Sequence, residues 1–249
     1  MRSLVASAFG RKIPDAVLSV FLAPSCAACD TLLDEPTRGP VCQACWQTIH
    51  PFIPPLCDVC GDPLRSWRVI TDESVACRRC TQTKHQVSQS RAIGEYDGSL
   101  RAIVHALKYD GRRSVARPLA DLLAQHGDAV LAGADLVVPV PLHRSRRRAR
   151  GFNQAAEIAR HLPVASAEVL KRVRATVSQT DLPAAERHAN VRNVFSKRRR
   201  ADVNGLVVVL VDDVSTTGAT LDSCARVLME SGAREVRALT AARVVSRPR

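Results

Sequence analysis

Two adjacent carboxylates, Asp212 and Asp213, come just before a run rich in hydroxyl groups, from Ser215 to Thr220. Hydroxyl and backbone N–H groups in such a run can donate hydrogen bonds to an anion, and Gly218 lets the backbone approach that anion closely. The carboxylates would repel the same anion, so they suit the hydroxyl groups of an attached sugar or a Mg²⁺ ion carried by the substrate. These residue types in this order therefore predict a site for a sugar phosphate. The alternative is an ordinary polar loop with no ligand.

Two elements must hold these groups in place. Val207–Val211 is a run of five aliphatic residues, so it predicts a central parallel strand that is buried on both faces and ends at the carboxylates. Ligands of open α/β sheets bind beyond the carboxyl ends of such strands. After Gly218 apolar residues recur at helical spacing until Ser231 and Gly232, so we expect a helix whose N-terminus faces the anion. The apolar stripe consists of Leu221, Cys224, Ala225, Leu228 and Met229.

The segment from Val208 to Thr220 resembles the 13-residue motif with which type I phosphoribosyltransferases bind phosphoribosyl pyrophosphate (PRPP). The resemblance implies that Asp212 and Asp213 hold the ribose hydroxyls or Mg²⁺, and that Thr216–Thr220 hold the 5′-phosphate. It places the following residues at PRPP: Asp212, Asp213, Ser215, Thr216, Thr217, Gly218, Ala219 and Thr220.

A basic segment follows another predicted strand. Asp135–Val140 is apolar enough for a buried strand, and five of the seven residues in Arg144–Arg150 are arginine. If both strands are parallel, this cluster lies at the same sheet edge as the carboxylates. We therefore expect a loop that folds over a pyrophosphate group and closes the site from water. The alternative is a solvated linker.

Eight of the nine cysteines form four Cys-x-x-Cys pairs, and two such pairs complete a tetrahedral Zn²⁺ site. Pairing in chain order gives a double zinc ribbon with two structural zinc ions, although the same spacing allows an interleaved arrangement. Disulfides, a thioredoxin-like redox role and an iron–sulfur cluster are weaker alternatives, given the absence of a convincing export signal and the number and spacing of the pairs. The ninth cysteine, Cys224, is expected to be a small buried hydrophobic residue. The candidate zinc ligands are Cys26, Cys29, Cys42, Cys45, Cys57, Cys60, Cys77 and Cys80.

Charge and composition narrow the class of protein. The net charge of +12 is concentrated in three segments: Arg144–Arg150, Lys171–Arg174 and Lys197–Arg200. Such segments can bind polyanions, either nucleic acid or a pyrophosphate ligand. The alternative is that they are only a solvated surface. No apolar run approaches the ~20 residues of a membrane span. Asp15 opens the short apolar stretch near the N-terminus, so we expect a helix and a cytoplasmic protein rather than a signal peptide.

Three regions follow from these patterns: an N-terminal helix in residues 1–23, a double zinc ribbon in residues 24–83, and a larger domain in residues 91–249. In the larger domain strand patterns alternate with helical ones, including helices near Leu100–Leu107 and from about Pro118. This alternation predicts an α/β fold with a doubly wound parallel sheet, in which Val169–Val173 is a further strand.

Three separated blocks of the α/β domain, the cysteine pairs and the segment His105–Gly111 together resemble the competence protein ComF family, also described as GntX-like or amidophosphoribosyltransferase-like. The resemblance implies a double zinc ribbon on a type I phosphoribosyltransferase fold, Mg²⁺ bound with PRPP, and a role in DNA uptake or in the use of DNA as a nutrient, together with a helicase and a channel. It also implies a pyrophosphate loop at Val138–Leu142 and a mobile loop at Arg150–Gln154. The blocks are Val138–His143 with Arg150–Gln154; Gln179, Leu182, Arg187, Asn190 and Phe195; and Val211–Thr220.

Two functions then compete. In a phosphoribosyltransferase the candidate catalytic residues are Asp212, Asp213 and Arg150, and residues 91–125 would form the hood that receives an unidentified acceptor. In a binding module the same pocket senses PRPP or a nucleotide, while the ribbons and arginines hold single-stranded DNA or a helicase partner. Aromatic residues that stack on bases are few, so such DNA binding should depend on charge. The remaining residues predicted to bind PRPP are Val138, Pro139, Val140, Pro141 and Gly151.

Overall fold

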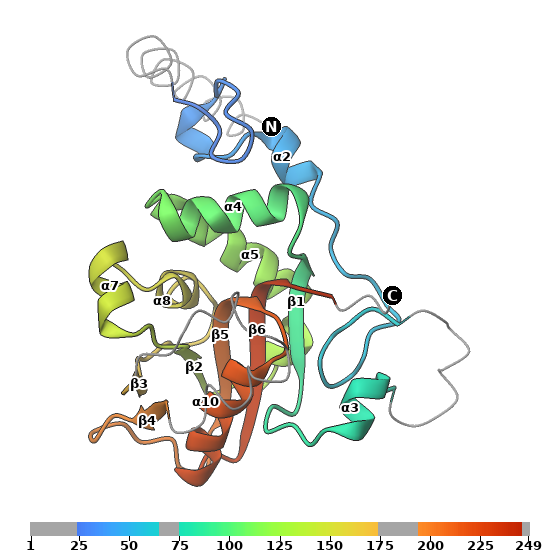
Figure 1. The fold of residues 1–249 in the computed structure, drawn as a ribbon, viewed down its shortest axis with the longest axis vertical. Coiled ribbons are helices and arrows are strands. Elements are labelled where there is room, and N and C mark those ends of the chain that lie inside the picture. The colour runs from blue at the N-terminus through green and yellow to red at the C-terminus, as the bar shows by residue number, and fades with distance from the viewer. Residues whose placement is uncertain (1–23, 65–74, 174–193, 246–249) are drawn as a thin grey trace, which may run out of the picture.

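The computed structural model describes residues 24–64, 75–173 and 194–245. The expected N-terminal helix in residues 1–23 and the block residues Gln179, Leu182, Arg187 and Asn190 lie outside these ranges. At the centre is a four-stranded sheet in the order β1-β6-β5-β2, in which all neighbouring strands are parallel (Figure 1). The prediction of an α/β fold around a parallel sheet is therefore confirmed. The sheet strands are β1 (Ser90–Glu95), β2 (Leu136–Pro139), β5 (Val207–Ser215) and β6 (Glu235–Arg243).

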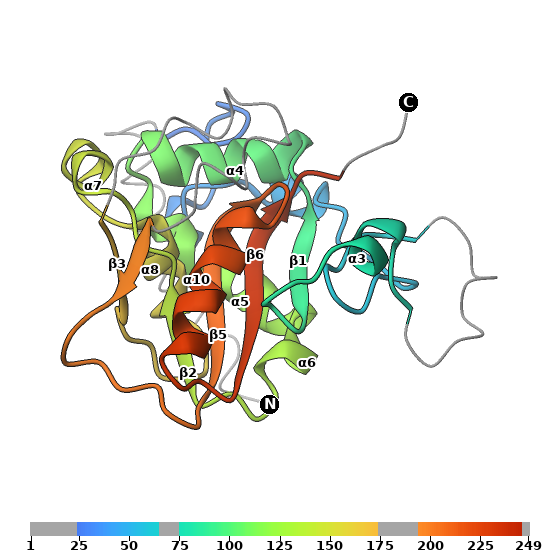
Figure 2. The ribbon, with the colours of Figure 1, turned by 60° about the horizontal axis from the view of Figure 1, so that its bottom comes forward.

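Helices cover both faces of this sheet. Alternate side chains of β5 enter separate cores, with Val209 and Val211 on one face and Val208 and Leu210 on the other, as the period of two in a strand requires. Helices α4, α5 and α8 pack on the first face and α10 packs on the second (Figures 1 and 2). The described helices are α2 (Gln43–Gln47), α3 (Arg78–Gln82), α4 (Gly98–Tyr109), α5 (Ala116–His126), α6 (Asp128–Leu131), α7 (Arg144–Arg150), α8 (Gln154–Ala159) and α10 (Ala219–Glu230), with 3₁₀ turns at Pro36–Arg38 and Arg113–Val115.

Two expectations about strands are wrong in detail. The strand after Val207 does not end at the carboxylates, because β6 continues to pair with it as far as Ser215 opposite Arg243. Val169–Val173 does not add to the parallel sheet either. Its strand β3 (Leu170–Arg172) pairs with β4 (Phe195–Lys197) in a separate antiparallel pair. The open edge of β2 carries an isolated parallel bridge between Val137 and Ser166, and no fifth strand joins the central sheet among the described residues.

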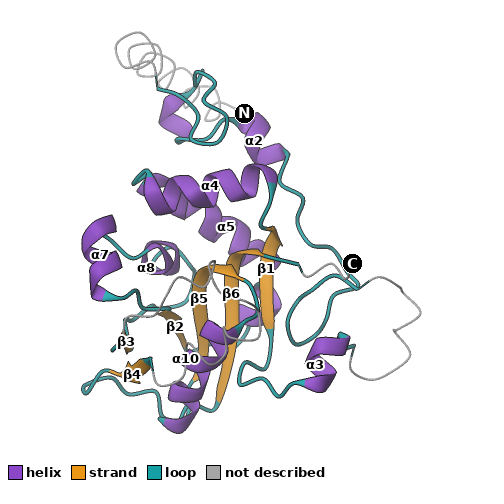
Figure 3. Cartoon of the chain, in the orientation of Figure 1, coloured by secondary structure: helices purple, strands orange, loops and turns teal. Residues whose placement is uncertain are grey.

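The cysteine pairs lie in two loop-rich modules (Figure 3). The first ribbon, residues 24–49, packs its helix α2 against α4, and its buried residues belong to the same core as α4 and α5. The second ribbon, residues 56–64 and 75–82, lies beside the outer edge of β1 (Figures 1 and 2). Among the described helices none is both long enough and apolar enough to span a bilayer.

Candidate functional site

The acidic pair lies near the carboxyl end of β5 and faces a lysine from a distant helix. Lys108 Nζ, on the last turn of α4, is 2.9 Å from Asp213 Oδ1. Both side chains are largely buried, at 15% and 12% exposed. The carboxylate of Asp212 turns back on the backbone and accepts a hydrogen bond from Asp213 N at 2.9 Å. One carboxylate is thus paired with a cation and the other is held by the chain.

Burial and the adjacent carboxylate raise the pKa of Asp212 to about 7. Desolvation is the larger cause, because a charged carboxylate loses hydration when it is buried. Burial works in the opposite direction on the amine, yet the carboxylates of Asp213 and Asp212 outweigh it and raise the pKa of Lys108. A cation placed beside Asp212 would lower this pKa and stabilise the ionised carboxylate.

The predicted anion loop, residues 215–220, follows the acidic pair after Val214. Gly218 has φ of 83°, in the left-handed region that favours glycine, and it is the N-cap of α10. Thr217 Oγ1 accepts a hydrogen bond from Ala219 N at 3.4 Å. The first N–H groups of α10 have no partner further back in the helix, so the loop and helix start form a site that suits an anion.

The predicted pyrophosphate segment lies next to β5. In the parallel register Val138 is opposite Leu210 and Pro139 is opposite Val211, and Val140 N donates to Val211 O at 2.9 Å. Asn153 Nδ2 donates to Val140 O at 3.0 Å, which fixes the segment from the other side. The structure therefore brings Val138–Pro141 to the same sheet edge as the acidic pair.

A basic cavity of about 610 Å³ opens beside this segment. Pro139 and Pro141 line it together with residues of α7, β3 and Arg198, whereas neither Asp212 nor Asp213 does. Glu168 contributes the acidic group of the lining and pairs with Arg147 at 3.2 Å and with Arg198 at 2.8 Å. The lining cations and histidine are His143, Arg144, Arg147, Lys171, Arg172 and Arg198.

The expected basic loop is a helix. Arg144–Arg150 forms α7, whose N-cap His143 accepts a hydrogen bond from Ser145 N and whose C-cap is Gly151 in the left-handed conformation. In the segment Arg150–Gln154, for which the resemblance implies a mobile loop, Phe152 and Gln154 are buried. Arginine is a good helix former, and an exposed helix needs no apolar stripe.

The site reaches into a segment that sequence reasoning did not include among the site residues. Arg150 lies over the ring of Tyr109 at 4.8 Å, and Gln154 Nε2 is 3.5 Å from Lys108 O. Lys108 and Tyr109 belong to His105–Gly111, a motif shared with the family, and lie within the predicted hood of residues 91–125. Neither signal assigned a role to Lys108, since the chain separates it widely from Asp213.

The cysteines form two clusters, each with all four Sγ atoms within 4.8 Å of one another. They pair in chain order, Cys26/Cys29/Cys42/Cys45 and Cys57/Cys60/Cys77/Cys80, so the interleaved arrangement is excluded. Tetrahedral Zn–S bonds of about 2.3 Å place the sulfurs about 3.8 Å apart. Measured separations agree: 3.8 Å for Cys29–Cys42, 3.9 Å for Cys26–Cys45 and 3.7 Å for Cys60–Cys77. Both clusters fit a structural zinc ion with no open coordination position.

Comparisons with protein families agree with the division of the chain into a cysteine-rich region and an α/β domain. Residues 17–81 match the family model of the double zinc ribbon domain, and residues 147–248 match that of the phosphoribosyl transferase domain. The chain is thus a phosphoribosyltransferase-type α/β domain preceded by a double zinc ribbon.

Curated relatives specify the family further. DNA utilization protein YhgH of Salmonella typhimurium is 34% identical over 206 residues, which cover 79% of this chain and 87% of that protein. Competence protein F of Haemophilus influenzae is 30% identical over 210 residues, with 80% and 88% covered. The chain belongs to this family, the ComF family.

Among solved structures, glutamine PRPP amidotransferase from B. subtilis is 25% identical, with a TM-score of 0.34. The match covers 55% of this chain and 30% of that enzyme.

Proposed function

We propose that this protein binds Mg²⁺-PRPP at the carboxyl edge of its parallel sheet and acts in the uptake or use of DNA. One observation carries the ligand: the acidic pair, the anion loop at the start of α10 and the Val138–Pro141 segment meet at one edge, with Pro139 opposite Val211. A ligand with a phosphate, a ribose and a pyrophosphate has complementary groups for all three parts.

Each part then has a role. Asp212 and Asp213 bind the ribose hydroxyls or the Mg²⁺ that arrives with the substrate, since Mg²⁺ commonly takes one or two carboxylates plus phosphate oxygens. The residues from Ser215 to Thr220 bind the 5′-phosphate with hydroxyl and backbone N–H groups. Backbone groups of Val138–Pro141 receive the pyrophosphate, and Arg150, set over Tyr109, approaches it from α7.

Lys108 balances part of the charge of the acidic pair. Its ammonium pairs with Asp213 at 2.9 Å. When Mg²⁺ and ribose arrive, Lys108 must move or share the carboxylate, so the ligand replaces one cation by another. If PRPP is also cleaved, Asp212 and Asp213 would hold the Mg²⁺, which would supply positive charge for the departing pyrophosphate, and Arg150 would add to that charge. The carboxylates would also stabilise positive charge on the ribose.

The role in DNA use rests on the relatives, whose names are DNA utilization protein YhgH and competence protein F. We propose that single-stranded DNA binds the basic cavity and the arginines of α7, and that a helicase or uptake component is a partner. The cavity supports this because it gathers cations from α7 and β3 beside the pyrophosphate segment. Two sites of four thiolates require reducing conditions, which supports a cytoplasmic location.

Calorimetric titration of the zinc-loaded protein with Mg²⁺-PRPP tests the ligand. Binding that is lost in Asp213→Ala and retained in Glu35→Ala, a carboxylate change at an exposed ion pair in the first ribbon, supports the proposal. Equal binding by both variants, or none by the wild type, contradicts it.

Incubation with PRPP and a panel of bases and amines then separates the two functions. Release of pyrophosphate identifies a transferase, whereas binding without release identifies a PRPP sensor.

DNA binding is tested by the affinity for a single-stranded oligonucleotide as the salt concentration rises. Contacts to phosphates predict a steep fall, and replacing Arg146, Arg147 and Arg148 by alanine should weaken binding and reduce the salt dependence. Unchanged affinity in this variant would remove α7 from the DNA site.

A further inference from the structure

The second ribbon is attached to β1 by a backbone hydrogen bond and by the side chain of Arg91. Ser90 N donates to Val59 O at 2.7 Å, and Arg91 Nη1 donates to Cys57 O at 3.2 Å. Gly61 has φ of 73°, and a Cβ atom there would lie 2.6 Å from Ser90 O, so only glycine permits this approach. The ribbon is therefore held tightly against the outer edge of the sheet.

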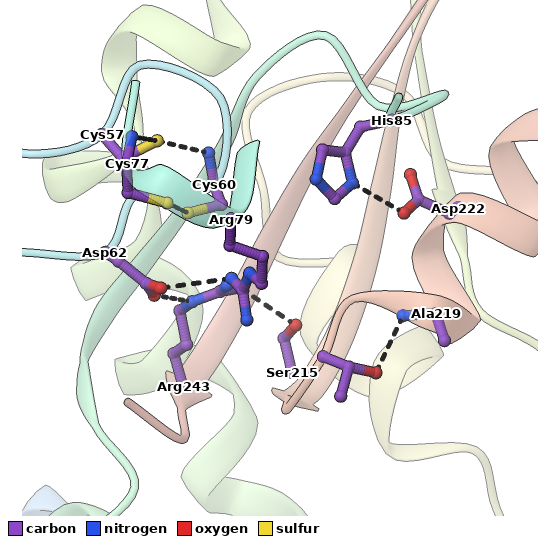
Figure 4. Close-up of polar contacts among 11 residues, drawn as sticks. Cys57, Cys60, Asp62, Cys77, Arg79, His85, Ser215, Ala219, Asp222 and Arg243 are labelled. Atoms are coloured by element: carbon purple, nitrogen blue, oxygen red, sulfur yellow. Dashed lines mark hydrogen bonds and ion pairs between the residues drawn. The ribbon is translucent and has the colours of Figure 1, made fainter. Parts of the chain in front are cut away.

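One carboxylate of this ribbon extends to the far side of β1. Asp62 follows the knuckle of Cys57 and Cys60, and it pairs with Arg79 at 3.1 Å inside the ribbon and with Arg243 at the end of β6 (Figure 4). The side chains of Asp62 and Arg243 are only 15% and 3% exposed. Two buried charges in contact need each other, because either one alone would be left without hydration or a partner.

Arg243 in turn contacts the first residue of the anion loop. Its Nη1 donates to Ser215 Oγ at 3.2 Å (Figure 4), and Val244 N donates to Ser215 O at 2.9 Å. Ser215 is buried at 4% exposed. Because its oxygen accepts from Arg243, its own hydroxyl hydrogen remains a donor for another group.

A second link joins the segment just after the second ribbon to the start of α10. His85 Nδ1 lies 2.9 Å from Asp222 Oδ2 (Figure 4), and Gln86 N donates to Asp222 Oδ1 at 3.0 Å. Asp222 lies in the first turn of α10. Between the two links is a cavity of about 20 Å³, enough for roughly one water molecule, which Cys60, Thr217 and Gly218 line together.

We propose that the second ribbon positions the anion loop: Asp62 orients Arg243, and Arg243 fixes Ser215 for binding of the 5′-phosphate. Asp62 and Arg243 are positioning residues, since they act through Ser215. The first ribbon has no corresponding contact with this loop among the described residues. The inference rests on the proposed function, because the loop is taken to bind a phosphate.

The main experiment titrates zinc-loaded Asp62→Asn with two parts of PRPP separately, ribose 5-phosphate and pyrophosphate. Asparagine keeps the size of the side chain and removes its charge. We expect affinity for ribose 5-phosphate to fall about tenfold, within the usual range of coupling between sites, and affinity for pyrophosphate to change less than about twofold. A general loss of structure would weaken both ligands alike.

Glu35→Gln is the matched control. It makes the same chemical change in the first ribbon, where Glu35 pairs with Arg38 at 2.8 Å. This variant should bind both ligands as the wild type does. An Asp62→Asn protein whose affinity for ribose 5-phosphate equals or exceeds that of the wild type would overturn the proposal.

Hydrogen exchange separates failure of this inference from failure of the proposed function. If the wild type binds neither ligand, the PRPP proposal fails, but the amides of residues 212–222 should still exchange faster in Asp62→Asn than in Glu35→Gln. Equal exchange there overturns the positioning role. If Asp62→Asn loses zinc, Arg243→Lys replaces it, because lysine keeps the charge but cannot contact Asp62 and Ser215 together; unchanged exchange in that variant overturns the proposal as well.

Discussion

The two ribbons carry the same set of four thiolates, yet they attach to the α/β domain through different kinds of contact. The first ribbon contributes Leu33, Val41 and Ile49 to the core beneath α4, and Thr48 adds a hydrogen bond of 2.7 Å to Ser99. The second ribbon is joined to β1 by a backbone hydrogen bond and to the anion loop by an ion pair and a side-chain hydrogen bond through Arg243. Apolar packing has little directionality, whereas hydrogen bonds fix orientation. The first ribbon therefore stabilises the domain, and the second orients part of its site.

Loss of one thiolate should separate the ribbons most clearly. Cys45 and Cys60 are both buried, and replacing either by serine should reduce the zinc content from two ions to one. We expect Cys60→Ser to weaken Mg²⁺-PRPP binding at least about tenfold and Cys45→Ser to change it less than about threefold, because only the second ribbon contacts the anion loop. Metal analysis and calorimetry measure both quantities. Equal loss of affinity in the two variants would contradict the comparison.

Removing one carboxylate from each ribbon should show the same difference in stability. Asp62→Ala leaves Arg243 as a buried cation without its carboxylate partner and should lower the free energy of unfolding by about 3–5 kcal/mol. Glu35→Ala breaks an exposed pair and should cost less than about 1 kcal/mol. Urea denaturation of the zinc-loaded variants measures both. The comparison is wrong if the two costs are similar.

The acidic pair lies on the side of the site that α4 and the first ribbon support, and it should respond to pH. Asp212 has a pKa raised from 3.8 to about 7, so the folded state prefers the neutral carboxyl. Its contribution to stability is complete below about pH 4 and is lost as pH rises through about 7. Asp212→Asn should match the wild type in unfolding free energy at pH 4 and exceed it by up to about 4 kcal/mol at pH 8.

Thermal or urea unfolding at several pH values, without Mg²⁺, measures this difference. Lys108→Met provides a second test, because loss of the nearby ammonium should raise the pKa of Asp212 further. The fall of its unfolding free energy with pH should therefore continue to a higher pH than in the wild type. A difference between Asp212→Asn and wild type that does not grow with pH would contradict the raised pKa.

The smallest effect should come from the polar contact of the first ribbon. Thr48→Val removes its hydrogen bond to Ser99 and should cost about 0.5–1.5 kcal/mol of stability. Affinity for Mg²⁺-PRPP should stay as in the wild type, since this contact lies on α2 and α4 and not on the anion loop. A clear fall in affinity would show that the first ribbon also controls the site.

Much of the fold could be predicted because it depends on local patterns. The aliphatic run of β5 and the helical stripes of α4 and α10 show their periods directly, and Cys-x-x-Cys pairs in series indicate the ribbons. The full length of β5 could not be predicted, since it depends on pairing with β6. Helix α7 was missed because its residues are charged and because His143 is not a usual N-cap residue, although Gly151 after it is a C-cap signal.

The site was predicted in part because some of its components are also local patterns in the sequence. The acidic pair, the anion loop and Val138–Pro141 were recognisable because each forms a short continuous motif. The contacts of Lys108 with Asp213 and of Asp62 with Arg243 join residues far apart in the chain. In the sequence, Lys108, Asp62 and Arg243 are isolated charged residues, and nothing beside them marks them as part of a site. Only the tertiary structure brings each of them to its partner.

The order of strands has a consequence for synthesis of the protein. The second ribbon and β1 leave the ribosome well before β6, the strand that pairs with β1 inside the sheet. An uncovered strand edge readily pairs with other chains. The ribbon lies on the outer edge of β1, opposite to the edge that β6 will occupy. Zinc supplied during translation should therefore fold the ribbon early and leave the nascent strand with one open edge instead of two until β6 is made.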